Sequence, residues 1–384
     1  MTMAFRVEPD TREKVATLGG AARYDLCGEG CGSAAHRVRD DLGRWIYPAV
    51  MPDGKRIELL KVLLTNACEK DCAYCANRAG RSVRRTRLRP EELARSFDAM
   101  ACRGLVKGLF LSSGIVGGGA ETMEELLKTV ELVRSRYRFD GYVHLKLLPG
   151  ARRDQVERAG ELADRVSINL ELPSYRWLHE VAPRKERREL VDPLRWATEF
   201  RARGRGRWAP AGQTTQFVVG AAEESDRELL QTASGLYGKL GLQRVYYSAF
   251  QPVTGTPLAD KPGTPLWREH RLYQSDFLLR RYGFVWDELI FDGQGHLLQE
   301  ADPKTAWAQA HPECYPVEVN TAPRAALLRV PGLGPRSVGR LIGARRDHPV
   351  RSLAELGSLG AVTTWASPYV LLDGRRPSHQ LSLW

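Results

Sequence analysis

The chain has 384 residues, of which 43% are apolar and 27% are charged, and its formal net charge is +11. Because single domains commonly contain roughly 100–200 residues, we expect one large domain with appended segments. No apolar run approaches the ~20 residues that span a bilayer, and no secretory signal opens the sequence. We therefore predict a soluble, cytoplasmic protein without membrane contact. The positive charge favours a polyanionic partner such as nucleic acid.

Residues 1–56 form an N-terminal extension with weak structural signals. After it, short apolar runs alternate with segments whose apolar residues recur every three or four positions. Six such β/α units in a row predict a parallel sheet with right-handed crossovers, either doubly wound or closed into a barrel. The expected strands are 57–64, 108–113, 142–148, 166–172, 214–219 and 244–250, and the expected helices are 90–103, 121–137, 153–165 and 224–240.

Polar residues on two of these strands favour the barrel. Side chains alternate along a strand, so Ser167, Asn169 and Glu171 share one face, as do His144 and Lys146. Parallel strands covered on both sides are usually apolar throughout, so a polar face indicates a lumen. We predict an α/β fold with a partial, TIM-like (β/α)6 barrel over residues 57–250.

The remaining chain divides into two parts. Residues 251–316 begin with a loop rich in Pro and Gly, contain one expected helix at 269–282, and are predicted to connect to the barrel and pack on it. Residues 317–384 are typical of helix, Gly-rich turn, helix, turn and helix. They predict a small, separate, all-helical module.

Three cysteines follow the first expected strand. The segment LLTNACEKDCAYCANR places Cys68, Cys72 and Cys75 at the spacing Cys-x3-Cys-x2-Cys. Three thiolates on one tight loop can ligate three corners of a [4Fe–4S] cluster. The fourth iron then stays open for S-adenosylmethionine, from which an electron of the cluster generates a 5′-deoxyadenosyl radical. A zinc site completed by a histidine and reduced structural cysteines are the alternatives.

This spacing, with Tyr74 before the third cysteine, resembles the signature of the radical S-adenosylmethionine superfamily. The resemblance implies that Tyr74 flanks the adenine of the cosubstrate. It also implies that the stretch after the second strand, here Ser112, Ser113 and Gly114, meets the amino group of the cosubstrate. The acidic residue that is common in that stretch is missing from this sequence.

Four lumen residues are further candidates for contacts with cosubstrate or substrate, and the alternative is a set of satisfied polar pairs in a partly buried lumen. They are His144, Lys146, Asn169 and Glu171. No catalytic side chain is identified. We expect Cys27, Cys31, Cys102 and Cys314 to be unligated. The alternative, that they bind a second cluster, is left open by the sequence.

The C-terminal module carries a signal for nucleic-acid binding. In LLRVPGLGPRSVGRLIGARR, the turn with Gly332 and Gly334 precedes a short helix that begins near Arg336 and Ser337 and continues to Arg340. Backbone N–H groups at such a turn can bind a phosphate. Residues 317–384 contain nine arginines and four acidic residues. The segment resembles a helix-hairpin-helix module, and the alternative is a structural hairpin.

Two further basic tracts occur at 78–89 and 201–207. Charge runs are usually solvated surface. Because these tracts lie near the expected lumen in the sequence, they are also candidates for steering a nucleic-acid backbone.

Together, LLKVLLTNACEKDCAYCANR, GLFLSSG, YVHLKLLPGA, NLELP and YPVEVN resemble the family of radical S-adenosylmethionine proteins assigned to DNA modification or repair. The resemblance extends from about Tyr24 to Leu359. It implies an enzyme that acts on DNA, linked with a uracil-DNA-glycosylase-like partner protein. An electron donor such as flavodoxin or ferredoxin is also expected.

The functional prediction is radical chemistry on a DNA nucleotide that has been extruded from the duplex or is already single-stranded. An RNA-modifying radical enzyme and a noncatalytic iron–sulfur DNA-binding protein remain alternatives. The sequence does not distinguish repair from modification, nor does it identify the base, the fate of the cosubstrate or the oligomeric state.

Overall fold

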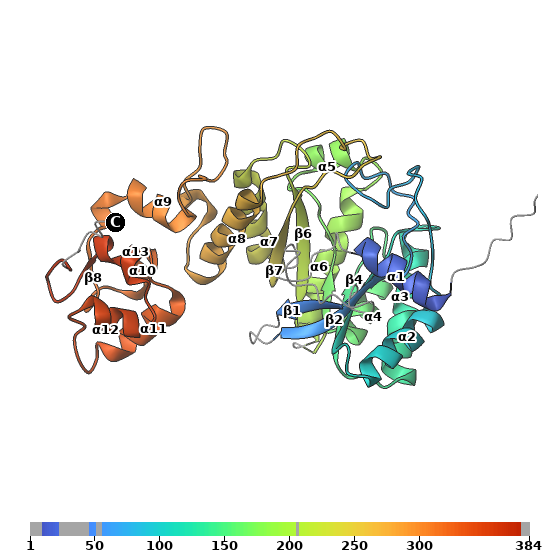
Figure 1. Ribbon diagram of the computed structural model, residues 1–384, viewed down its shortest axis with the longest axis horizontal. Helices are drawn as coiled ribbons and strands as arrows, with labels where there is room; N and C mark the ends of the chain where they lie inside the picture. The colour runs from blue at the N-terminus through green and yellow to red at the C-terminus, as the bar shows by residue number, and fades with distance from the viewer. Residues whose placement is uncertain (1–9, 23–45, 51–55, 205–206, 378–384) are drawn as a thin grey trace, which may run out of the picture. The chain divides into compact units, whose positions relative to one another are not determined.

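The structure is a computed structural model that describes residues 10–22, 46–50, 56–204 and 207–377. The chain divides by its internal packing into two compact units (Figure 1). The first comprises Met1–Glu224 and Gly235–Thr264, and the second comprises Ser225–Ser234 and Pro265–Trp384.

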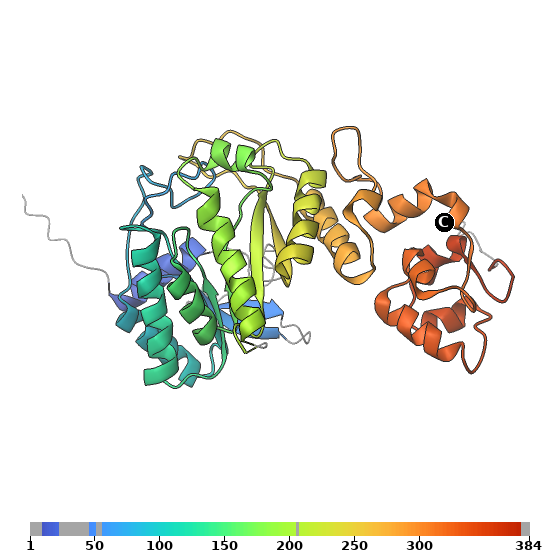
Figure 2. The same cartoon turned by 180° about the vertical axis from the view of Figure 1, so that it is seen from behind.

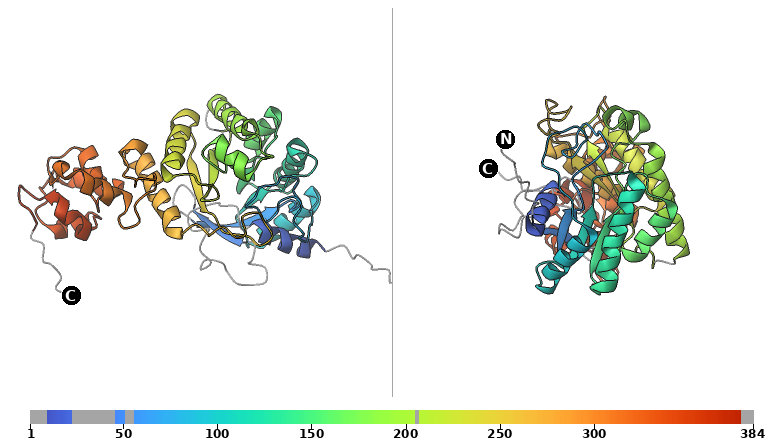
Figure 3. Two further views of the ribbon diagram at one scale, coloured as in Figure 1. Left: turned by 90° about the horizontal axis from the view of Figure 1, so that it is seen from above. Right: turned by 90° about the vertical axis from the view of Figure 1, so that its right-hand side faces the viewer.

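The first unit contains a seven-stranded sheet in the order β1 to β7. β1 is antiparallel to β2, and all other neighbours are parallel. The sheet curls into a half-barrel (Figure 3), which confirms the predicted fold class and all six expected strands. The strands are β1 Ile46–Val50, β2 Arg56–Leu63, β3 Gly108–Ser112, β4 Tyr142–Lys146, β5 Arg165–Ser167, β6 Gln213–Val219 and β7 Arg244–Ala249.

Helices cover the outer face of this sheet (Figure 2). Apolar strand residues such as Leu60, Leu109 and Leu145 are fully buried against them. Neighbouring helices contact each other in the order α2, α3, α4, α6. The helices of this unit are α1 Thr11–Ala21, α2 Pro90–Cys102, α3 Gly119–Glu131 with a π-helical turn at Leu132–Arg136, α4 Arg153–Leu162, α5 Tyr175–Val181 and α6 Arg187–Arg203. α7 Asp226–Leu240 is divided between the two units after Ser234.

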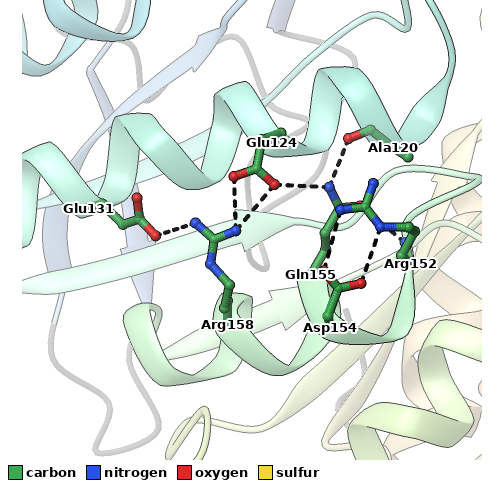
Figure 4. A network of polar contacts seen from close by, with 7 residues as sticks. All are labelled: Ala120, Glu124, Glu131, Arg152, Asp154, Gln155 and Arg158. Atoms are coloured by element: carbon green, nitrogen blue, oxygen red, sulfur yellow. Dashed lines mark hydrogen bonds and ion pairs between the residues drawn. The ribbon is translucent and has the colours of Figure 1, made fainter.

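A polar network joins α3 to α4 (Figure 4). Arg158 donates to both oxygens of Glu124, at 2.8 and 3.1 Å, and also to Glu131. The amide of Gln155 donates to the Ala120 carbonyl at 2.8 Å and to Glu124 at 3.1 Å. Because Arg158 contacts two carboxylates, it fixes the two helices in register more firmly than one exposed ion pair would.

Four elements differ from the sequence-based expectation. The N-terminal extension contains α1 and β1, and α6 was not anticipated as a helix. β5 ends at Ser167 instead of residue 172, because the chain turns away from regular pairing before Glu171. Glu171 has a φ of +67° and rejoins β6 only through an isolated bridge with Phe217.

The second unit is largely helical, as expected for its C-terminal part. A two-residue parallel pair, β8 Val317–Glu318 with β9 Val370–Leu371, closes that part. Its buried core includes Leu327, Leu333 and Leu341. The helices are α8 Leu266–Arg281, which matches the expected 269–282, α9 Pro303–Ala310, α10 Arg324–Arg329, α11 Pro335–Ala344, α12 Leu353–Ser358 and α13 Thr363–Ala366.

None of the helices in the described part of the chain is both long enough and apolar enough to span a membrane.

Candidate metal centre

The three clustered cysteines lie on the irregular segment that follows β2. Cys72 is 5% exposed, and Cys68 and Cys75 are half-buried. A turn brings the second and third cysteines together, since Cys75 N donates to Cys72 O at 3.1 Å. The backbone N–H of Asn77 donates to Cys75 Sγ at 3.3 Å, which favours the thiolate form. The sequence-predicted ligands therefore share one short, partly buried loop.

The guanidinium of Arg85 organises this loop. It donates to the carbonyl groups of Asn66, Asn77 (3.0 Å), Arg78 (2.8 Å) and Arg81 (3.2 Å). These carbonyls come from both sides of the cysteine motif. Because a loop without regular structure needs other partners for its backbone, this one side chain replaces a ladder of backbone hydrogen bonds.

The loop also depends on a close approach at Gly114. The Gly114 N–H donates to Thr65 O at 2.7 Å. A Cβ atom at this position would lie 2.0 Å from Ala67 O, so only glycine fits. Ser112 is buried beside it, and the buried hydroxyl oxygen of Ser113 has no hydrogen-bond partner among the described residues. The predicted stretch 112–114 thus lies against the cysteine loop and presents an unsatisfied polar atom.

The cysteine thiols lie close enough to influence one another electrostatically. Burial raises the pKa of Cys72, and Cys68 adds to that effect. Burial and the neighbouring Cys72 raise the pKa of Cys75 to about 12. No three metal-ligating side chains among the described residues converge on a single ion. A cubane cluster does not need such convergence, because its three cysteines each bind a different iron.

A buried ion pair lies beside the cysteines. Lys185 Nζ and Glu171 Oε1 are 2.6 Å apart, with side-chain exposures of 11% and 6%. Burial lowers the pKa of Lys185, but the nearby Cys72 and Glu171 raise it above its ordinary value. Asn169 Nδ2 lies 3.5 Å from the other oxygen of Glu171. A cation next to thiolates offsets the negative charge that a ligated cluster would bring.

Tyr74 lies in the same environment. Its hydroxyl is buried near the Glu171 carboxylate and the Cys72 thiol, without a hydrogen bond of regular geometry to a described residue. Burial raises the pKa of Tyr74 well above its usual value, and the Glu171 carboxylate adds to this effect. The unsatisfied hydroxyls of Tyr74 and Ser113 are both available to a polar ligand at this edge of the sheet.

The structure also shows how the Gly-rich loop is held. Glu69, inside the cysteine motif, accepts a hydrogen bond from the Gly118 N–H at 3.3 Å. Gly117 and Gly118 have φ values of +73° and +96°, and Gly119 begins α3. The backbone conformation of this loop therefore favours glycine. The hydrogen bond from Gly118 to Glu69 links the loop, and the helix that it begins, to the cysteine segment.

His144 and Lys146 lie deeper, on the side of the sheet away from the helices. We call this surface the lumen face and define it as Lys61, Phe110, His144, Lys146, Arg165, Ser167, Thr214 and Arg244. His144 Nε2 is 2.7 Å from Ser167 Oγ, and Lys146 is 6% exposed. Burial lowers the pKa of His144 well below its usual value, and the charges of Arg165, Lys146 and Lys61 lower it further. The ring therefore stays neutral.

The basic tract at 78–89 is mostly engaged within the protein. Besides Arg85, Arg78 donates to Asp71 O at 3.2 Å and Arg81 to Ala76 O at 2.8 Å. Arg84 and Arg87 pair with Glu13 and Glu125. Five of the six arginines thus bind carbonyl or carboxylate groups of the chain, which leaves little of this tract to steer a nucleic-acid backbone. Of the second tract, Arg205 lies outside the described residues.

The predicted DNA-binding residues surround the start of α11. Gly334 is the N-cap, its N–H donates to Ser337 Oγ at 2.8 Å, and Ser337 is buried. Arg336 and Arg340 are exposed and four residues apart, so they share one face of the helix. Gly332 has a φ of +77°, and a Cβ there would lie 2.3 Å from Val362 O. Packing within the C-terminal module therefore requires glycine at position 332.

A buried lysine supports this turn, and the sequence analysis had not identified it. Lys304 is 7% exposed, its ammonium donates to Leu333 O, and it lies 4.7 Å above the ring of Tyr282. Burial lowers the pKa of Lys304 to about 7. Nothing in the local sequence distinguishes Lys304 from an exposed helical lysine.

The remaining cysteines fall into two groups. Cys27 and Cys31 lie outside the described residues. Cys102 and Cys314 are exposed thiols, and each lies next to a carboxylate, Asp98 or Glu313.

Residues 62–235 match the family model of the Radical SAM superfamily. No curated protein matches the sequence. The superfamily uses a [4Fe–4S] cluster and S-adenosylmethionine, which are the cofactors predicted from the cysteine spacing. The buried cysteine loop, the adjacent Lys185 and the two unsatisfied hydroxyls fit these groups.

Several solved structures are similar to the chain. HydG, a maturase of the [FeFe]-hydrogenase, shares 13% identity at a TM-score of 0.43, over 56% of this chain and 48% of its own. HydG from Carboxydothermus hydrogenoformans shares 16% identity at a TM-score of 0.44, over 56% of this chain and 50% of its own. Methylornithine synthase (PylB) shares 16% identity at a TM-score of 0.44, over 56% of this chain and 60% of its own. The chain thus spans about half to three fifths of the length of these proteins.

Replacing Gly114 with alanine tests the close approach of the two loops. Because the new Cβ would overlap Ala67 O, we expect Gly114→Ala to lower the free energy of unfolding by about 2 kcal/mol or more. We also expect it to reduce iron incorporation. Gly235→Ala is the control, since no atom lies within 4 Å of a Cβ there and the helix should gain ~0.5–1 kcal/mol. Equal effects of the two substitutions would contradict the packing argument.

Removing one partner of the buried ion pair tests its role. We expect Lys185→Met to cost about 3–5 kcal/mol in denaturant unfolding, because the Glu171 carboxylate would stay buried without its cation. The double variant Lys185→Met/Glu171→Gln should recover most of this loss. Arg195→Ala, which removes an exposed partner of Asp192, should change stability by less than about 0.5 kcal/mol. A single variant as stable as the parent would contradict the argument.

The neutral His144 predicts a pH dependence. Below the ordinary histidine pKa of about 6.5, the unfolded chain binds a proton that the folded chain excludes, so stability falls as the pH falls. From pH 7.5 to 5.5, this group should contribute a loss of about 1.4 kcal/mol. His144→Gln should remove that contribution, as measured by denaturant unfolding at both pH values. The same pH slope in both proteins would show that His144 titrates normally.

Proposed function

We propose that this chain, whose residues 62–235 match the Radical SAM family model, is an enzyme that modifies or repairs a DNA nucleotide by radical chemistry. When bound, the cluster and S-adenosylmethionine supply a 5′-deoxyadenosyl radical that abstracts hydrogen from carbon. The observation that carries the radical-chemistry part of the proposal is the partly buried loop with Cys68, Cys72 and Cys75 at the edge of the half-barrel.

The residues around this loop have separate roles in the proposal. The three cysteines hold three irons, and Lys185 offsets the resulting negative charge. The backbone at Ser112–Gly114 and the hydroxyl groups of Ser113 and Tyr74 contact the cosubstrate. Asn169 and Glu171 lie beside Lys185 and contribute further polar groups. Burial of the site keeps water away from a reactive intermediate.

The C-terminal helices support the DNA half of the proposal. At the start of α11, the backbone N–H groups of Arg336 and Ser337 precede the first intrahelical bond, which joins Val338 N to Gly334 O at 2.8 Å. Such N–H groups and the positive end of the helix dipole suit a phosphate. The exposed Arg336 and Arg340 add two cations on one face. This arrangement is consistent with a helix-hairpin-helix module that binds a DNA backbone without reading its sequence.

Duplex DNA imposes a further requirement. A hydrogen on a stacked nucleotide is out of reach of a buried radical site, so the target must be single-stranded or extruded from the helix. A uracil-DNA-glycosylase-like partner protein would fit this requirement, since such enzymes act on an extruded nucleotide. An electron donor such as flavodoxin or ferredoxin would reduce the cluster.

The test of the radical chemistry is formation of 5′-deoxyadenosine. The protein is reconstituted anaerobically with iron and sulfide, reduced, and mixed with S-adenosylmethionine, with and without single-stranded or damaged DNA. We expect cleavage that rises with DNA and is abolished by Cys72→Ser. Cys102→Ser, which alters an exposed thiol, should leave it unchanged. An intact cluster without cleavage would favour the noncatalytic DNA-binding protein.

The salt dependence of DNA binding tests the DNA-binding part of the proposal separately from the radical chemistry. Each phosphate contact adds a slope of about −0.9 to the plot of log K against log salt concentration for duplex DNA. Arg336→Ala/Arg340→Ala should therefore reduce the slope by about 2, whereas Arg195→Ala should not change it. Tighter binding to structured RNA than to DNA would favour the RNA-modifying enzyme.

A further inference from the structure

Two large apolar side chains are exposed beside the turn that precedes α11. Trp365 on α13 is 59% exposed, and Val362, which directly precedes that helix, is 48% exposed. We call these two residues the apolar pair. The neighbouring Ala366 is fully buried in the core of the C-terminal helices and anchors α13 there. Because tryptophan is strongly buried on average, an indole that faces solvent from an anchored helix is unusual.

Backbone contacts hold the apolar pair against the Gly332 turn. Val362 N donates to Gly332 O at 2.9 Å. A Cβ on Gly332 would lie 3.0 Å from Ala366 N and 3.2 Å from Trp365 Cβ. The exposed indole therefore projects from a position directly beside the turn at which α11 starts.

The basic face of α11 reaches the segment that carries the apolar pair. A Cβ on Gly360, two residues before Val362, would lie 3.1 Å from Arg340 Nη1. Arg336 shares its helix face with Arg340, and both are exposed. Neither arginine side chain forms a hydrogen bond or an ion pair with another described residue. Two guanidinium groups that the described residues do not neutralise thus lie near the indole and suit an anionic partner.

The face of α11 that carries these arginines is otherwise open. Gly339 and Gly343 are exposed, and no atom lies within 4 Å of a Cβ built at either position. Residues 336, 339, 340 and 343 follow the spacing of one helix face. Glycine inside a helix lowers its stability relative to alanine but lets another chain approach the backbone closely. The face can therefore be approached by a nucleic-acid backbone without side chains in the way.

A nucleotide combines the two kinds of group that this surface can bind. Its phosphate suits the arginines and the first N–H groups of α11, and its base suits an indole. Base stacking on an aromatic side chain tolerates any sequence, because every base has a π-face. In duplex DNA those faces are covered by the neighbouring base pairs. An exposed indole beside a phosphate-binding turn therefore fits DNA with unpaired bases better than intact duplex.

We infer that Trp365 stacks on an unpaired base of the DNA strand whose backbone is bound at the start of α11. The C-terminal helices then select single-stranded DNA, which agrees with the requirement for a target outside the duplex. The identity of the ligand as DNA rests on the proposed function. The preference for unpaired bases rests on Trp365 and its position beside Gly332 and Arg340.

Two oligomers with equal numbers of phosphates isolate the stacking. One is an oligothymidylate, and the other carries the same phosphates on abasic sugars. In fluorescence anisotropy, we expect the full-length protein to bind the oligothymidylate about fivefold or more tightly, which is the contribution of one stacked base. Trp365→Leu, which keeps an apolar side chain without a ring, should lose most of this preference. Trp365→Phe, which keeps a ring, should retain most of it.

Duplex binding and thermal stability separate stacking from a structural role. The affinity for a relaxed, closed-circular duplex, which offers no unpaired base, should be the same in all three proteins. Because Trp365 is exposed, its substitution should shift the thermal midpoint by less than about 2 °C. Phe277→Leu is the matched control, since Phe277 is 43% exposed but its ring contacts Tyr282 and Arg280. It should leave the preference for the oligothymidylate unchanged.

An unchanged preference for the oligothymidylate in Trp365→Leu would overturn the inference. Equal losses of affinity for both oligomers, together with a lower thermal midpoint, would also overturn it, because Trp365 would then be a structural residue. If Arg336→Ala/Arg340→Ala weakens binding of both oligomers while Trp365→Leu affects neither, DNA binding by α11 stands and the stacking inference is wrong. If the parent protein binds no DNA, single-stranded or duplex, the DNA-binding part of the proposed function is itself wrong.

Discussion

The cysteine loop has no helix or strand of its own, and its shape depends on the hydrogen bonds that Arg85 donates to four carbonyl groups. Three thiols on a mobile loop would have to be ordered by the cluster itself, at an entropic cost for every residue fixed. Here the protein bears that cost during folding. The approach of Gly114 to Ala67 then fixes the loop against the end of β3. The three cysteines and the backbone at Ser112–Gly114 are thereby positioned by one set of contacts.

Buried charged side chains in the first unit have two kinds of environment. At the edge of the sheet, Glu171 and Lys185 neutralise each other, and the left-handed backbone of Glu171 is held by hydrogen bonds to β6 on both sides. Below that edge, the contacts that Lys61 and Arg165 make with described residues are to aromatic rings and neutral oxygens. Buried charges of the same sheet are therefore stabilised in different ways.

The sequence predicts much of this architecture because the relevant signals are local. Periodicity identifies the six parallel strands, and cysteine spacing predicts the metal loop. Lys185 and Arg85 could not be identified in this way, since each acts through contacts that only folding brings together. Lys61 was hidden in an apolar strand, where one basic residue suggests an edge position. The strand at 166–172 was predicted too long, because its apolar alternation continues through the turn at Glu171.

The net charge of +11 suggested nucleic acid, but the structure divides that charge among different uses. Most arginines of the 78–89 tract hold carbonyl or carboxylate groups of the protein. Carboxylates offset the charges of Arg84 and Arg87, whereas an arginine that binds a neutral carbonyl keeps its charge. Arg336 and Arg340 are instead exposed on one face of α11. Position in the fold, and not the length of a basic tract, therefore decides which arginines are accessible to a partner.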